Sequence, residues 1–273
     1  VHGAAFEEPG RAHVPPIHLS TVFRFESVAE MAAVFKAEQP GWIYARYGSP
    51  TVELVERHVA ALEGAPAALA TASGMSAIAA ALMGGLAAGD HLVAAADLYG
   101  GTRHLFDVIF RRLGLTTDYF PLDDPARLEA LIRPNTRAVY VETPTNPTLR
   151  VIDVADVAAR ARAHGLLTLV DNTFATPLLQ NPLRLGADLV IHSGTKALGG
   201  HDDVLAGFVA GRADLVGAAR DVMKTFGATL DPHAAWLLER GLKTLGVRVA
   251  RQCDNAEALA AWLAVHPAVA RVY

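Results

Sequence analysis

Short runs of apolar residues recur along this chain, and stretches with helical spacing separate them. Several runs are apolar along their whole length instead of alternating with polar residues, which is typical of strands covered by helices on both faces, as in a parallel sheet. The pattern therefore predicts an α/β fold, doubly wound. The expected strands span 67–72, 91–96, 116–120, 138–142, 167–170, 189–192 and 206–210. The expected helices span 52–62, 74–86, 103–113, 154–164 and a stretch from Pro232, broken or loosened at Gly246. Residues 1–45 are expected to be irregular.

Composition narrows the class of protein. Hydrophobic residues make up 52% and charged residues 19% of the chain, which indicates a well-packed domain. The net charge of −4 gives no reason to expect nucleic acid or an anionic membrane as a partner. Cys253 is the only cysteine, which excludes an intrachain disulfide and fits a cytoplasmic setting. The uncharged stretch after Glu63 is too rich in Ala, Gly, Ser and Thr for a membrane helix.

Ligands of such sheets bind outside the carboxyl ends of the strands, so the polar residues that follow each strand are the candidates for a site. After the first strand, Gly74 and Met75 open a helix, where small residues and free N–H groups suit a phosphate. An ordinary capped helix is the alternative. After the second strand, Tyr99 precedes two glycines and could stack on a flat ring, or belong to a plain surface turn.

The next two candidates are an amide and an acid. Asn146 lies in a loop with two prolines, which fix its direction; a rigid connection without a ligand is the alternative. Asp171 ends a buried apolar run, where a carboxylate is costly without a partner. A protonated heterocycle would be such a partner, and a helix cap or a buried ion pair is the alternative.

Lys196 differs from the other three lysines, Lys36, Lys224 and Lys243, each of which is interpreted as a solvated amine on a helix. It follows the strand at 189–192, with the hydroxyls of Ser193 and Thr195 before it and glycines after it. An amine in this place can attack an aldehyde, and the hydroxyls can hydrogen-bond a phosphate. An exposed lysine on an ordinary turn is the alternative.

Together these clusters supply phosphate donors, a stacking ring, an acid for a ring nitrogen and an amine for an aldehyde. Those are the requirements for using pyridoxal 5'-phosphate (PLP) as an electron sink. We therefore predict PLP as the cofactor, attached at Lys196 and kept protonated on its ring by Asp171. His192 and His201 have the spacing of no common metal site, so no metal is expected.

The ordered motifs resemble the Cys/Met-metabolism family of PLP enzymes, which includes cystathionine γ-synthase, cystathionine γ-lyase and methionine γ-lyase. The resemblance covers about residues 1–273, and the ordered set is far more specific than any single motif. It implies the fold type I PLP-transferase architecture, with a mostly parallel seven-stranded sheet between helices. The motifs are YARYGSPT (44–51), ASGMSAI (72–78), LYGGT (98–102), ETPTNP (142–147), DNTF (171–174), HSGTKALGGH (192–201) and RGLKTL (240–245).

The resemblance also implies roles for single residues. Lys196 would hold the cofactor and later move protons, Asp171 would pair with the ring nitrogen, and Tyr99 would stack on the ring and take part in proton transfer. Tyr44 and Arg46 would reach the phosphate of the neighbouring subunit, which implies a homodimer or a homotetramer of two such dimers. The other implied cofactor contacts are Gly74, Met75, Ser193 and Thr195 at the phosphate, Asn146 beside the ring hydroxyl, and Thr173.

The same resemblance implies three parts of the chain. Residues 1–48 would be an arm that contacts the neighbouring subunit, 49–245 the PLP-binding large domain, and 246–273 the start of a smaller C-terminal domain. Family members continue for roughly another third of their length, in keeping with two-domain chains. The smaller domain, with the arginine expected to bind the substrate carboxylate, is therefore expected to be truncated here.

The reaction implied is elimination or replacement at the γ- or β-carbon of a sulfur-containing or O-acylated amino acid, in the cystathionine, methionine and homoserine-ester class. A lyase of the trans-sulfuration type is favoured, and O-acetylhomoserine sulfhydrylase or cystathionine γ-synthase is the alternative. A remnant that binds cofactor without activity is a non-enzyme alternative. The S-x-x-K motif at 193–196 also occurs in penicillin-binding proteins, but their S-D-N and K-T-G elements are missing here.

Overall fold

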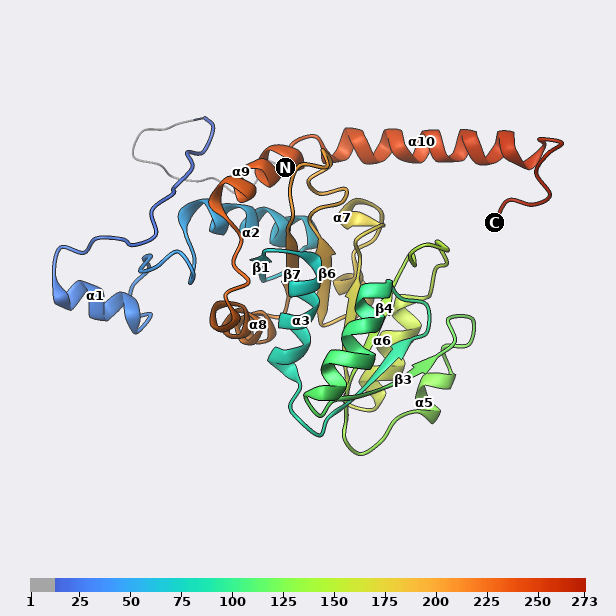
Figure 1. Cartoon of the computed structure of the whole chain (residues 1–273), viewed down its shortest axis with the longest axis horizontal. Helices are drawn as coiled ribbons and strands as arrows, with labels where there is room; N and C mark the ends of the chain where they lie inside the picture. Colours follow the sequence, from blue (N-terminus) through green and yellow to red (C-terminus); the bar gives the residue numbers. More distant parts are fainter. Residues whose placement is uncertain (1–12) are drawn as a thin grey trace.

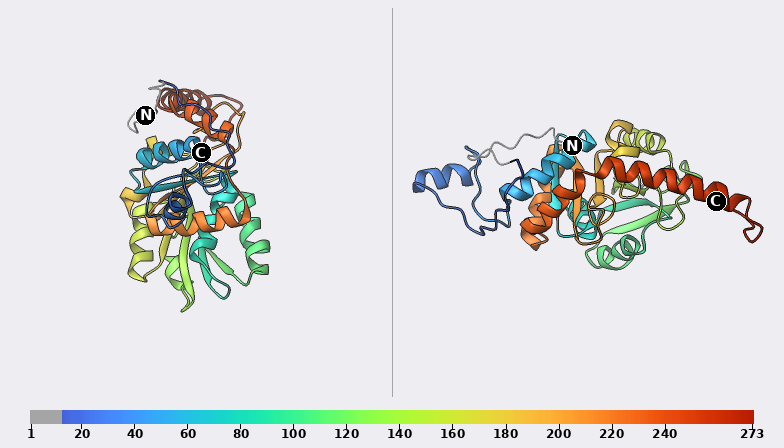
Figure 2. Two further views of the ribbon diagram at one scale, coloured as in Figure 1. Left: turned by 90° about the vertical axis from the view of Figure 1, so that its left-hand side faces the viewer. Right: turned by 90° about the horizontal axis from the view of Figure 1, so that it is seen from above.

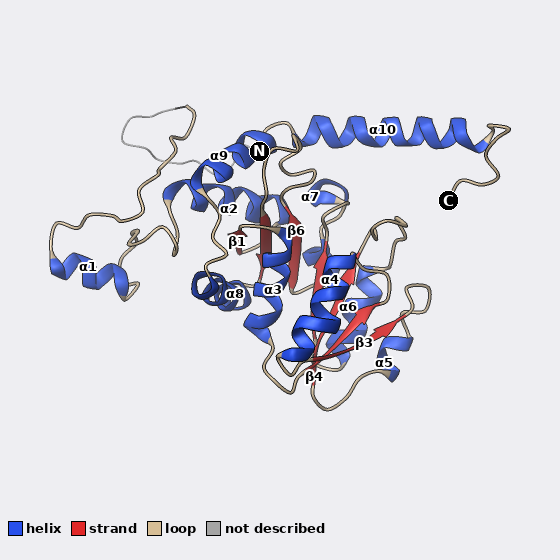
Figure 3. Cartoon of the chain, viewed as in Figure 1, coloured by secondary structure: helices blue, strands red, loops and turns tan. Residues whose placement is uncertain are grey.

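A single sheet organises residues 13–273, the part of the chain that the computed structural model describes. Its strands lie in the order β1-β7-β6-β5-β4-β2-β3, with helices packed around them (Figure 3). Neighbouring strands from β3 to β6 are parallel, and β7 is antiparallel to both β6 and β1. The predicted α/β fold with a mostly parallel sheet is therefore confirmed. The strands are β1 (Ala67–Thr71), β2 (His91–Ala95), β3 (Thr116–Phe120), β4 (Thr136–Glu142), β5 (Leu167–Asp171), β6 (Leu189–Ser193) and β7 (Gly207–Gly211).

Helices cover both faces of the sheet, because successive strand residues point to opposite sides. On β1, Ala68 and Ala70 pack in one buried cluster with α2 and α9, whereas Leu69 belongs to the other cluster, with α3 and α8. On β7, Phe208 and Val209 divide in the same way. The α-helices are α1 (Val28–Phe35), α2 (Pro50–Glu63), α3 (Gly74–Gly85), α4 (Gly100–His104), α5 (Arg127–Ala130), α6 (Val154–Ala163), α7 (Thr176–Leu179), α8 (Ala213–Phe226), α9 (Pro232–Leu242) and α10 (Leu245–Ala264). A π-helical segment (Leu105–Phe110) continues α4, and a 3-10 turn (Pro182–Leu185) follows α7.

Helix α1 makes the N-terminal segment less irregular than the sequence analysis predicted. Ser27 Oγ accepts the Glu30 N–H at 3.1 Å, and the Glu30 carboxylate accepts the Glu26 N–H at 2.6 Å. Ser followed three residues later by Glu is a signal for a helix start, which the prediction overlooked. Helix α1 projects from the body on the side opposite to the end of α10 (Figures 1 and 2). Residues 1–12 of the predicted arm lie outside the described part.

The C-terminal helical stretch breaks at Lys243 and Thr244, so the predicted break at Gly246 was wrong. The Thr244 N–H and hydroxyl both bond to the Gly241 carbonyl, at 3.2 Å each, which turns the chain between α9 and α10. Gly246 lies inside α10. Within the described residues, no helix combines the length and the apolar character needed to cross a membrane.

Gly207 marks the closest approach between β7 and the turn before α3. A Cβ at this position would lie 2.1 Å from the Ser73 carbonyl oxygen and 2.5 Å from its carbon, both backbone atoms. We expect Gly207→Ala to lower the free energy of unfolding by about 3 kcal/mol, since backbone must move. Denaturant titration of both proteins measures this difference in the free energy of unfolding.

Gly217→Ala is the matched control. Gly217 is exposed inside α8, and nothing lies within 4 Å of an added Cβ. Alanine is the better helix former, so this variant should gain up to about 1 kcal/mol. An unchanged stability of Gly207→Ala would contradict the steric argument.

Candidate active site

A cavity of about 240 Å³ lies at the carboxyl ends of β4, β5 and β6, where a ligand is expected in a parallel sheet. All predicted site residues except Tyr44 and Arg46 line it: Gly74, Met75, Tyr99, Asn146, Asp171, Thr173, Ser193, Thr195 and Lys196. Six further residues line it that were not predicted as site residues: Ser73, Ile78, Glu142, Pro144, Phe174 and Leu205.

The start of α3 forms one wall. Ser73 caps this helix, and its hydroxyl accepts the Ser76 N–H at 3.2 Å in a reciprocal capping box. A Cβ on Gly74 would lie 2.9 Å from Ser193 Cβ, so only glycine lets the end of β6 approach the helix this closely. The wall thus combines a helix N-terminus with the hydroxyl of Ser193, and both favour an anion such as phosphate.

Asp171 lines the cavity at the end of β5. Its Oδ1 accepts the Thr173 N–H at 3.0 Å and the Thr173 hydroxyl at 2.6 Å, and the Tyr140 hydroxyl lies 3.4 Å from Oδ2. Burial raises the pKa of Asp171, although the Thr173 hydrogen bonds and the charge of His192 act in the opposite direction. The ionised carboxylate would therefore gain from a cation placed in the cavity.

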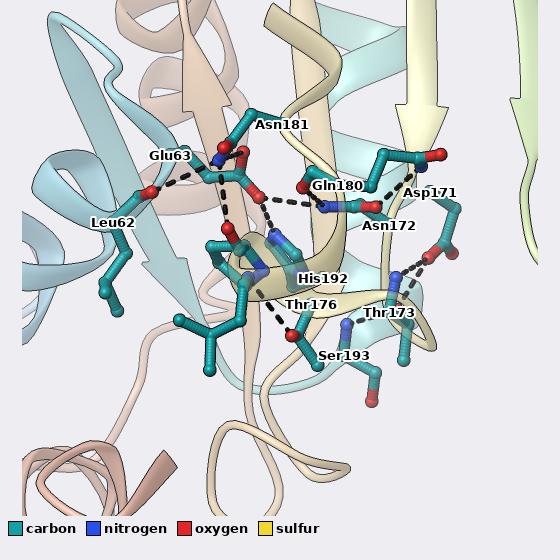
Figure 4. Close-up of polar contacts among 12 residues, drawn as sticks. Leu62, Glu63, Asp171, Asn172, Thr173, Thr176, Gln180, Asn181, His192 and Ser193 are labelled. Carbon is teal, nitrogen blue, oxygen red and sulfur yellow. Dashed lines mark hydrogen bonds and ion pairs between the residues drawn. The ribbon is translucent and has the colours of Figure 1, made fainter. Parts of the chain in front are cut away.

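Thr173 connects this acid to Ser193 and so to the wall formed at the start of α3. Its hydroxyl donates to Asp171 and accepts the Ser193 N–H at 2.8 Å (Figure 4). One short chain of hydrogen bonds therefore joins the ends of β5 and β6 and fixes Asp171 relative to Ser193.

Lys196 and Tyr99 are exposed members of the cavity wall, as are Phe174 and Leu205. Lys196 follows β6 in a turn in which its N–H bonds to the Ser193 carbonyl at 3.2 Å, and no ion pair holds its amine among residues 13–273. The Tyr99 ring is 47% exposed, and Gly101 leaves room for it, since a Cβ there would lie 2.5 Å from the ring. Thr195 Oγ1 accepts the Ala206 N–H at 3.1 Å.

Behind the cavity, the buried carboxylate of Glu63 connects the ends of the same two strands (Figure 4). Glu63 Oε1 lies 2.6 Å from His192 Nε2 and accepts the Asn172 side-chain amide at 3.1 Å. His192 precedes Ser193 and Asn172 follows Asp171, so one residue of each pair faces the cavity and its neighbour faces Glu63. Both histidines that were weighed as metal ligands have other contacts. His192 contacts Glu63, and His201 Nδ1 lies 2.8 Å from the Gly199 carbonyl oxygen.

Tyr44 and Arg46 lie away from this cavity in their own chain. The Arg46 guanidinium lies 5.4 Å from the Tyr44 ring centre and 4.9 Å from that of Tyr47, and it donates to the Lys224 carbonyl of α8. Neither residue lines this chain's own cavity.

Glu142 is the main residue that the sequence analysis missed. It ends β4 next to Asp171 and is 6% exposed, and the argument applied to Asp171, an acid at the end of a buried strand, would also have found it.

The chain matches the family model described as Cys/Met metabolism PLP-dependent enzyme over residues 1–273. The chain belongs to this family. The resemblance inferred from the motifs and the prediction of PLP as the cofactor are therefore confirmed.

Curated relatives and a solved structure agree with this assignment. Two curated relatives are each 43% identical to this chain, and each match covers 100% of the chain. One is O-succinylhomoserine sulfhydrylase of Pseudomonas aeruginosa, of which the match covers 70%. The other is L-methionine gamma-lyase of Pseudomonas putida, of which it covers 69%. The crystal structure of cystathionine gamma-lyase from Lactobacillus plantarum complexed with L-serine matches with a TM-score of 0.92 and 39% identity, over 100% of this chain and 69% of that one. These likenesses also support the predicted fold type I architecture.

The residues present in this family member fit PLP. The buried Asp171 suits a protonated ring nitrogen, the α3 N-terminus and Ser193 suit the phosphate, and Lys196 offers an amine for the aldehyde. Gly74 adds a steric fit, since any side chain there would fill the space against Ser193.

Glu63→Ala should lower the free energy of unfolding of the cofactor-free protein by about 3–5 kcal/mol, because it removes one partner of a buried pair. Denaturant titration measures the change. Glu129→Ala is the control, since Glu129 pairs with Arg160 at 2.8 Å at the surface and should contribute little. Equal losses in the two variants would contradict a special role for the buried pair.

Proposed function

We propose that this family member catalyses elimination at the γ- or β-carbon of a sulfur-containing or O-acylated amino acid. The observation that supports the proposal best is the meeting of Lys196 and Asp171 in one cavity beside the α3 N-terminus. These groups come from separate strands and a helix, and a cofactor with an aldehyde, a basic ring nitrogen and a phosphate would use all of them at once.

In this proposal, Lys196 binds the cofactor aldehyde and Asp171 holds the ring nitrogen protonated. Thr173 orients the Asp171 carboxylate, and Tyr99 stacks on the ring. The phosphate contacts are Gly74, Met75, Ser193 and Thr195, and Asn146 lies beside the ring hydroxyl. When bound, PLP supplies an electron sink for the charge left when the substrate loses its α-proton.

The chain's own side chains move the protons. The amine of Lys196, when it is not attached to the cofactor, would be the base that removes the α-proton of the substrate. Tyr99 lies at the exposed edge of the cavity and would exchange a proton with the departing part of the substrate. The buried Asp171 keeps its carboxylate beside the ring throughout, which is electrostatic stabilisation by a preorganised group.

Replacement instead of elimination is the second candidate. The relative from Pseudomonas aeruginosa is named as an O-succinylhomoserine sulfhydrylase, and it is as similar to this chain as the methionine lyase is. O-acetylhomoserine sulfhydrylase and cystathionine γ-synthase reactions belong to this second candidate, and a chain that binds PLP without turnover is the outcome that would reject both.

We also propose that the active unit is a homodimer or a tetramer of dimers, in which Tyr44 and Arg46 complete the partner's site. Their position on the arm, away from the cavity of their own chain, supports this arrangement. Residues 1–48 would then be the arm, 49–245 the PLP-binding domain and 246–273 the start of a second domain. The single cysteine supports a cytoplasmic setting.

The central test uses Lys196. Borohydride should fix PLP to Lys196 in the wild-type protein, and a tryptic mass map locates the modified peptide. Wild type should also release an α-keto acid from methionine or cystathionine, or consume sulfide with an O-acylhomoserine. Lys196→Ala should lose turnover by several orders of magnitude, because it lacks both the point of attachment for the cofactor and the base. Modification at another lysine, or substantial activity of Lys196→Ala, would reject the assignment.

The dimer proposal predicts complementation. Arg46→Ala and Lys196→Ala should each be nearly inactive alone, but after mixing and subunit exchange one site in each mixed dimer carries neither lesion, as two-fold symmetry requires. Recovered turnover measures the effect. No recovery, despite mixed dimers seen by native mass spectrometry, would place Arg46 outside the partner's site.

A further inference from the structure

Glu142 lies where two loops of the cavity meet. It ends β4 in register with Asp171 of β5, and both side chains line the cavity. Glu142 Oε2 accepts the Tyr99 N–H at 2.7 Å, and Oε1 accepts the Asn146 N–H at 2.9 Å. One buried carboxylate therefore uses both oxygens to connect two loops that are 47 residues apart in sequence.

Other hydrogen bonds also hold these segments, since the Thr145 N–H bonds to the Arg150 carbonyl at 3.0 Å. The Tyr99 and Asn146 amides themselves both bond to the same carboxylate, that of Glu142. Tyr99 is the N-cap residue of α4, and no side chain caps that helix, so Glu142 is what anchors its start. Asn146 begins the exposed part of the loop after β4. Through these bonds Glu142 sets the distance between the Tyr99 ring and the Asn146 side chain, the two groups proposed to contact the ring of PLP.

The charge on Glu142 decides whether it can accept both bonds. A carboxylate accepts at both oxygens, whereas a protonated acid has one hydroxyl that donates and accepts poorly. Burial raises the pKa of Glu142 to about 7, with a further contribution from the charge of Asp171, and the two amide hydrogen bonds oppose the shift. The titratable groups around it are Tyr140 of β4, Asp171 of β5, and Tyr99 and Lys196 at the cavity wall.

We propose that Glu142 is a positioning residue that holds the Tyr99 and Asn146 loops together in its ionised form and releases one of them when it takes up a proton. The cofactor site is then closed around the ring on the alkaline side and loosened on the acidic side. The consequence for PLP rests on the proposed roles of Tyr99 and Asn146, but the clamp itself is a property of the cofactor-free chain.

A second carboxylate joins the same two loops at the surface and provides a matched control. Asp97 Oδ2 lies 2.8 Å from Arg150 Nη1, and both side chains are partly exposed, where an ion pair contributes little. Asp97→Asn and Glu142→Gln therefore both replace a carboxylate by an amide. The first change affects an exposed contact between the two loops, and the second affects a buried one.

Hydrogen exchange of the cofactor-free protein tests the clamp directly. Peptides covering 97–103 and 143–149 are followed at pH 6 and pH 8, with each rate divided by the intrinsic rate of the unfolded peptide at that pH. In wild type and Asp97→Asn, protection of at least one of these peptides should fall about fivefold at pH 6, the effect of losing one hydrogen bond. Glu142→Gln should show the lower protection at both pH values.

Equal protection of wild type at pH 6 and pH 8 would overturn the proposal, and this result needs no variant, so it stands even if Glu142→Gln fails to fold. Full protection in a folded Glu142→Gln would overturn it too.

The dissociation constant of PLP tests the consequence for the site. Glu142→Gln should bind PLP about fivefold more weakly than wild type at pH 8, and the ratio of the two constants should approach one at pH 6, where both side chains are neutral. Asp97→Asn should match wild type throughout. A ratio of dissociation constants that is the same at both pH values rejects the link between the Glu142 contacts and cofactor binding. Failure of borohydride to attach PLP to Lys196 rejects the proposed function instead. In that case the hydrogen-exchange result still tests whether Glu142 holds the two loops together.

Discussion

Two carboxylates end adjacent strands at the same edge of the sheet, and the loops around the cavity are arranged to give them hydrogen-bond donors. Asp171 and Glu142 are register partners in β5 and β4, and burial raises the pKa of both. Thr173 supplies both donors for one oxygen of Asp171, and the backbone of Tyr99 and Asn146 supplies those for Glu142. A buried carboxylate without such donors would cost several kcal/mol, so the positions of these loops follow from the acids that they contact.

A second layer of polar contacts holds the strand ends from behind. The alternation of side chains along β5 and β6 places Asp171 and Ser193 toward the cavity and sends Asn172 and His192 to Glu63. Glu63 ends α2, so a helix on one face of the sheet fixes residues that act on the other side. Close backbone approaches at Gly74 and Gly207 bring α3 and its N–H groups to the same point.

Much of this arrangement was predictable because it depends on short-range patterns. Apolar runs marked all seven strands to within a few residues, and the motifs after them marked nine residues of the cavity wall. The missed features have specific causes. Glu142 was correctly placed at the end of a predicted strand, but it was weighed only as part of a loop motif and not as a buried acid. The Ser27 capping signal of α1 was overlooked, and the helix expected around Lys224 was given no bounds, so α8 was not delimited. The break before α10 depends on hydrogen bonds from Thr244 to the Gly241 carbonyl, which the prediction of a break at Gly246 did not consider.

The sequence alone determined the class of fold, the cofactor and nine residues of the cavity wall, because strand periodicity and the chemistry after each strand are local properties. Only the tertiary structure decided which acids are neighbours, that Glu63 contacts residues behind the cavity, and that Tyr44 and Arg46 lie away from their own site. Those facts depend on strand order and on contacts between residues far apart in the chain, such as Glu63 and His192, and a linear sequence carries no direct record of which distant groups meet once the sheet forms.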